Sequence, residues 1–124
     1  MKSYLMGLIA LMLVVVLAFV FTACADAPEV GEFSMDEYEW EIENYRTEGN
    51  VGAATDADSA IASAKALWLE KYDVNIRNNK IEVAYDSAEE CWHIRGIISS
   101  DMLGGGYDAI IQKNGDVIAV WVED

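Results

Sequence analysis

A long apolar run near the start of the chain sets the first limit on its fold. Residues Leu5 to Phe21 carry no charged side chain over about 17 positions, and Lys2 places one positive charge before them. A charged start, an apolar middle and small residues at the exit are the layout of an export signal. We therefore expect residues 1–23 to be a signal segment and the remainder to fold without it.

Ala23 and Cys24 follow this run directly. They resemble the lipobox of bacterial lipoproteins, in which the cysteine is acylated and the leader is removed in front of it; Phe21 stands where leucine is usual. The resemblance implies a lipoprotein anchored in the membrane through Cys24. Signal-peptidase cleavage after Ala25 and an uncleaved membrane anchor are the alternatives. All three place the remaining chain outside the cytoplasm, in the cell envelope.

The exported part of the chain is strongly acidic. The leader holds one of the eight basic residues and none of the 22 acidic residues, so the remainder has a formal charge of −15. This charge opposes binding to nucleic acid, which is itself a polyanion. It suits a soluble surface, and it also suits a basic protein partner.

Residues 24–54 form an acidic segment that we expect to be a partly ordered spacer. Nine acidic residues stand there against one basic residue, Arg46, and Pro28 and Gly31 favour an extended start. A short helix, an ordered arm or a segment that orders on a partner are all open. Aromatic residues among charges are typical of interfaces, so we predict partner contacts at Tyr38, Trp40 and Tyr45.

Residues 55–124 read as a small domain of class α+β. Thr55 to Tyr72 has an apolar stripe with helical spacing, and Thr55 with Asp58 resembles a capping box. Four segments with strand character follow, at 80–86, 90–98, 107–113 and 116–122, and Asn114-Gly115 marks a hairpin. We expect one amphipathic helix packed on a curved antiparallel sheet of about four strands.

Candidate catalytic chemistry is confined to Cys91 and His93, which are two apart on an expected strand and so share a face. Catalytic partners usually converge from separate segments, so a packed cysteine and a surface histidine are the favoured interpretation. We expect no catalytic residue, no metal site and no cofactor. The carboxylates of Asp86, Glu89 and Glu90, like those of Asp101 and Asp108, are expected to be solvated.

The C-terminal residues also resemble a known family. The pattern consists of an alanine-rich helix ending in Ala66-Leu67-Trp68, then Cys91-Trp92-His93-Ile94-Arg95-Gly96, then Gly104-Gly105-Gly106-Tyr107, and finally the hairpin at Asn114-Gly115. It is similar to immunity proteins with a nuclear-transport-factor-2-like fold, from bacterial polymorphic toxin systems. The family often ends in His-Gly, whereas this chain ends in Trp121-Val122-Glu123-Asp124. The resemblance covers Thr55 to about Trp121, and it implies a nuclear-transport-factor-2-like or cystatin-like fold.

The resemblance implies a non-catalytic protein that binds and neutralises a toxin at the envelope. A second family fits almost as well: PepSY-like propeptide modules also run helix, strands and terminal hairpin, and the partner would then be an exported protease. The helix end at Ala66 to Tyr72 and the Asn114-Gly115 hairpin are compatible with either.

Overall fold

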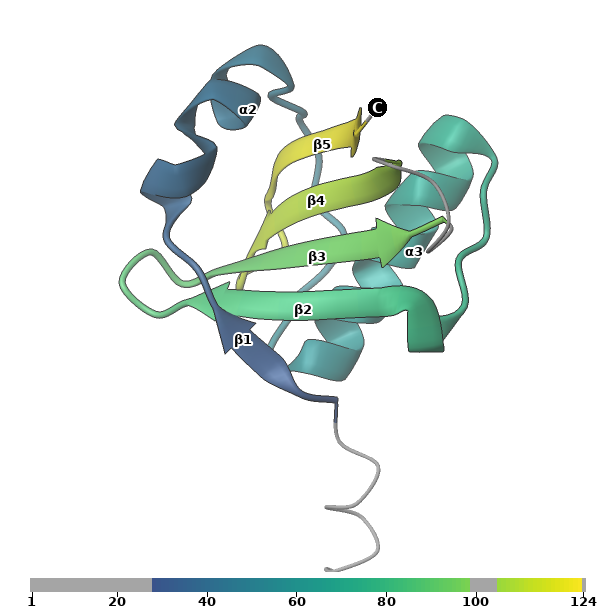
Figure 1. The fold of residues 1–124 in the computed structure, drawn as a ribbon. Helices are drawn as coiled ribbons and strands as arrows, with labels where there is room; N and C mark the ends of the chain where they lie inside the picture. The colour runs from purple at the N-terminus through teal and green to yellow at the C-terminus, as the bar shows by residue number, and fades with distance from the viewer. Residues whose placement is uncertain (1–27, 99–104, 124) are drawn as a thin grey trace, which may run out of the picture.

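A five-stranded mixed sheet is the centre of the fold in residues 28–98 and 105–123, the part that the computed structural model describes (Figure 1). The signal segment and Cys24 lie outside these residues. In the sheet the strands follow chain order, from β1 to β5. Their bounds are β1 Val30–Glu32, β2 Ile81–Asp86, β3 Cys91–Ile97, β4 Gly106–Gln112 and β5 Val117–Glu123. The helical elements are η1 Met35–Tyr38, α2 Glu39–Asn44, α3 Ala57–Tyr72 and η2 Asn78–Lys80.

The prediction of class α+β is confirmed, while the predicted sheet of about four antiparallel strands is incomplete. Strands β2 to β5 pair antiparallel and begin and end within two residues of their predicted bounds. The fifth strand, β1, comes from the acidic segment and pairs parallel with β2. A strand of three exposed residues has no buried alternation, so the sequence pattern did not reveal it.

Helix α3 covers one face of the sheet. Its N-cap is Asp56, whose side chain accepts from the backbone N–H of Ser59 while the Ser59 hydroxyl accepts from Asp56, so the capping box lies one residue later than predicted. The helix ends at Asp73, which is left-handed at φ 57° and donates its N–H to Leu69. Ala60 and Ala64 are fully buried, and these small side chains let the helix lie close to the sheet.

Two tryptophans hold the core between α3 and the sheet. Trp68 is fully buried and its indole N–H donates to the backbone oxygen of Asp108 at 3.3 Å. Trp92 donates to the oxygen of Ala54 at 2.7 Å, which fastens the segment before α3 to β3. Buried indoles normally find such acceptors, because an unpaired N–H away from water is costly. Both indole N–H groups are thus paired inside the core between α3 and the sheet.

The opposite face is covered in part by η1 and α2, which lie apart from α3 in Figure 1. Its core consists of buried residues from three strands, joined by partly buried side chains from the acidic segment and by Ile118 of β5: Cys91, Ile110, Ala119 and Trp121 with Phe33, Met35, Tyr38, Ile42 and Ile118. The predicted spacer thus contributes a strand and two short helical elements to the fold. Its apolar residues are the physical reason, since they bury against the sheet.

The segment after α2 runs along the free edge of β5. The N–H of Thr47 donates to Ile118 at 3.0 Å, and the N–H of Val117 donates to Gly49 at 2.9 Å. These bonds satisfy part of the edge and so hinder pairing with another chain. At the predicted hairpin, Gly115 has φ 97°, and a Cβ there would collide with the carbonyl of Gly52. Glycine is therefore required at position 115, where the segment after α2 passes over the turn between β4 and β5.

Candidate functional site

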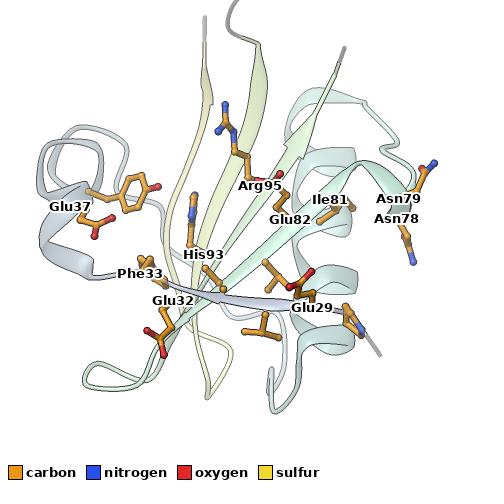
Figure 2. Close-up of a pocket in the computed structure, with 16 residues that line it drawn as sticks. Glu29, Glu32, Phe33, Glu37, Asn78, Asn79, Ile81, Glu82, His93 and Arg95 are labelled. Carbon is orange, nitrogen blue, oxygen red and sulfur yellow. The ribbon is translucent and has the colours of Figure 1, made fainter. Parts of the chain in front are cut away.

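An open groove lies on the sheet face that η1 and α2 cover only in part. Its volume is about 660 Å³, and β1, η1, β2 and β3 supply its walls and floor. Figure 2 shows Glu37 at one end, Asn78 and Asn79 at the other, and β1 crossing between them. Its charged side chains are Glu29, Glu32, Glu37, Glu82 and Arg95, with His93 on the floor.

His93 and Arg95 reach the groove because they are two apart on β3 and therefore share a face. The register pairs Arg95 with Asp108 of β4, and it pairs Asp108 with Trp121 of β5. Residues paired directly across neighbouring strands lie in one row on the same face of the sheet. Arg95 and Asp108 share such a row with Glu82 of β2, so the row contains three ionisable residues.

A buried histidine–aspartate pair forms the inner part of the site. His93 Nε2 and Asp108 Oδ1 are 2.7 Å apart, and the residues are 7% and 1% exposed. Aromatic rings surround the imidazole: its centroid is 4.5 Å from that of Tyr38 and 5.5 Å from that of Phe33, and it stacks on Trp121 at 6.1 Å. The expectation of a surface histidine and a solvated Asp108 is wrong, because sheet pairing brings the two together under these rings.

An ion pair between β3 and β5 adjoins the histidine–aspartate pair. Arg95 Nε lies 3.0 Å from Glu123 Oε2, although the two groups are not oriented for a hydrogen bond. Burial raises the pKa of Glu123, and the nearby Asp108 carboxylate raises it further, while Arg95 acts in the opposite direction. Burial, followed by the charge of Asp108, also raises the pKa of Tyr38. The four residues of the two pairs thus form one polar network on three strands.

Cys91 lies on the same face as His93, as predicted, but its environment keeps the thiol protonated. The residue is 1% exposed, it is not in a disulfide, and its Sγ donates to the backbone oxygen of Glu89 at 3.3 Å. Burial raises the pKa of the thiol to about 11, helped by Asp86, Glu89 and Glu90. Nucleophilic catalysis requires a thiolate near neutral pH, so this cysteine is packed as a small apolar residue.

Asp86 has a structural role that the expected solvation did not anticipate. Its carboxylate accepts the backbone N–H of Met35 at 2.9 Å and also those of Ala88 and Glu89. These bonds hold its pKa below the ordinary value, with the bond from Met35 as the largest cause. Asp86 thereby fastens the start of η1 to the turn between β2 and β3.

The three predicted contact residues are placed in two different ways. Tyr38 faces inward, where its ring lines the groove and packs on His93. Trp40 and Tyr45 face outward from α2 and its end, with exposed fractions of 61% and 39%. Their rings make an edge contact at 5.8 Å, and Tyr45 stacks on Trp121 at 6.2 Å. The outward pair is therefore held by the fold although it is open to solvent.

Sequence reasoning missed Arg95, Asp108, Glu123 and Glu82 as members of one site. The same-face spacing of His93 and Arg95 was a usable signal, because two ionisable residues alternate there with apolar ones. Nothing in the local pattern related them to Asp108 or Glu123, which the strand register supplies.

Within residues 28–98 and 105–123, no group of three or more histidine, cysteine, aspartate or glutamate side chains is arranged to hold a metal ion. In the same described ranges, no helix is both long enough and apolar enough to span a membrane. Comparison of the chain with protein-family models, with curated proteins and with solved structures finds no match. The described surfaces and the sequence are therefore the basis for proposing a role.

Proposed function

We propose that the chain is an exported lipoprotein, anchored through Cys24, that binds and neutralises a toxin protein at the cell envelope. The observation that carries the proposal is the outward pair formed by Trp40 of α2 and Tyr45 at its C-terminal end. Their exposed fractions of 61% and 39%, on an element packed against the sheet, support a protein contact there. The resemblance of residues 55–121 to immunity proteins supports the choice of a toxin as the partner.

The charge around this pair indicates what kind of protein would fit it. Glu39, Glu41 and Glu43 lie on α2, the first just before Trp40 and the other two between Trp40 and Tyr45, and α2 includes no basic side chain. Carboxylates around an apolar centre favour a partner with basic residues, because they raise the rate of encounter and select against acidic proteins. We therefore expect the toxin to present a basic surface.

The test is protection of living cells. Cells that express the full chain are exposed to a candidate cognate toxin, and survival is compared with that of cells expressing Trp40→Ala. The control is Leu69→Ala, since Leu69 is 53% exposed on α3, across the sheet. We expect Trp40→Ala to reduce protection at equal protein level and Leu69→Ala to leave it intact. Equal protection by the two variants would show that α2 is not the contact surface.

A second pair of measurements tests the anchor and the class of partner. Mass spectrometry of the purified protein should find acyl groups on Cys24, and Cys24→Ser should release the protein from membranes. An unmodified Cys24 would contradict the lipoprotein assignment. If the chain inhibits an exported protease and gives no protection from a toxin, the PepSY-like alternative replaces the immunity function.

A further inference from the structure

We propose that the groove between β1, η1, β2 and β3 binds an extended, basic segment of the protein partner. This inference rests on the proposed protein-binding function and names a site and a ligand chemistry for it. The groove is distinct from the outward pair of Trp40 and Tyr45, although η1 joins the two along the chain.

The charges of the groove favour cations. Four glutamates line it, Glu29, Glu32, Glu37 and Glu82, and all four are exposed. Among the described residues none of the four is in an ion pair. The one guanidinium in the groove, that of Arg95, already lies 3.0 Å from Glu123. A basic segment would therefore meet carboxylates that have no internal partner.

The walls of the groove suit the side chains of arginine and lysine. Phe33 and Tyr38 line it, with their rings 6.0 Å apart at an angle of 64°. A guanidinium or ammonium group gains from the face of an aromatic ring, and the aliphatic stem of the same side chain packs against it. The groove thus offers carboxylates to the positive charge of an arginine or lysine side chain and aromatic rings to its aliphatic stem.

The backbone of β1 favours an extended ligand over a single side chain. In the described sheet β1 is the edge strand and pairs on one side only, with β2. Its three residues are all exposed, and among the described strands none pairs with its outer side. Extended peptides bind sheet edges in this manner, with main-chain bonds for affinity and alternate side chains for specificity.

The groove is long enough to hold more than one side chain of a ligand. It runs from Glu37 of η1 to Asn78 and Asn79 of η2, across β2 and β3 (Figure 2). At that end the amide of Asn79 can exchange hydrogen bonds with a peptide backbone, whereas the amide oxygen of Asn78 already accepts from Lys65 Nζ at 2.7 Å. A volume of about 660 Å³ accommodates several residues of an extended chain.

The experiment measures binding of a short fluorescein-labelled peptide of alternating arginine and valine. The protein is the full chain in nonionic detergent, and the readout is fluorescence anisotropy. A peptide of alternating glutamate and valine serves as the ligand control. We expect the basic peptide to bind, with an affinity that falls as salt is added, and the acidic peptide not to bind. Failure of the basic peptide to bind would overturn the inference.

Matched variants separate the groove from the overall charge of the protein. Glu32→Gln with Glu82→Gln removes two carboxylates from the groove, and Glu70→Gln with Glu89→Gln removes two exposed carboxylates elsewhere. We expect the groove variant to bind about five- to tenfold more weakly and the control variant to bind like the parent. Equal weakening in the two variants would show non-specific attraction and overturn the inference. Because no toxin is used, this result and the protection assay can fail independently.

Discussion

The imidazole of His93 and the carboxylate of Asp108 meet at 2.7 Å on neighbouring strands, 15 positions apart in the sequence. The register pairs His93 with Ile110, so Asp108 is its diagonal neighbour on the same face. Both side chains are at least nine-tenths buried. A buried polar group is tolerated when it is paired, so each of these residues makes the other acceptable inside the sheet.

Removal of the Asp108 carboxylate should destabilise the fold. Asp108→Asn leaves His93 buried without its acidic partner and should cost about 2–4 kcal/mol in the free energy of unfolding. Glu70→Gln, on the exposed side of α3, should change stability by less than about 0.5 kcal/mol. Urea denaturation followed by tryptophan fluorescence measures both. A loss below about 1 kcal/mol for Asp108→Asn would show that the pair contributes little.

The loss of folding stability at low pH should depend on Asp86. Backbone N–H groups, that of Met35 first, hold its pKa below the ordinary carboxyl value in the folded state. The stabilisation is therefore fully present above that ordinary value, about 4, and is lost as the pH falls through the lower folded pKa. Asp86→Asn should be less stable than the parent at pH 7, and its stability should fall less between about pH 5 and pH 2. Parallel curves for the two proteins would contradict this account.

Cys91 should resist alkylation in the folded protein. Burial raises its pKa to about 11, so the thiolate fraction at pH 8 is roughly a hundredfold lower than for a free cysteine. In a Cys24→Ser background, iodoacetamide should modify Cys91 slowly in buffer and rapidly in denaturant. Mass spectrometry at timed intervals gives both rates. Equal rates in the two conditions would mean that the thiol is accessible and ionised.

Glycine at position 96 should be required by the packing of the core. A Cβ there would lie 2.5 Å from Ile76 Cδ1 and 3.1 Å from Trp68 Cζ3. Gly96→Ala should therefore cost about 1–3 kcal/mol in unfolding free energy, because the core has no room for the extra carbon. Ile76→Val removes the nearest atom, so Gly96→Ala should cost less in that background. Additive effects in the double variant would place the cause elsewhere.

The elements that were predictable are those with a local signal. The alanine-rich stripe of α3, the alternation in β2 and the Asn114-Gly115 hairpin each show a period or a turn pair within a few residues. Strand β1 was not predictable, because its pairing with β2 joins residues more than fifty positions apart and leaves no alternation in three exposed residues.

The sequence alone determined the acidic character of the chain after residue 23, the helix and four of the five strands, because each depends on composition or on side chains that are near neighbours. The tertiary structure decided where the charges meet. His93, Asp108, Arg95 and Glu123 come together only through the registers of β3, β4 and β5, and β1 converts an open sheet face into a groove. Register is a property of paired strands, so no single strand could reveal it.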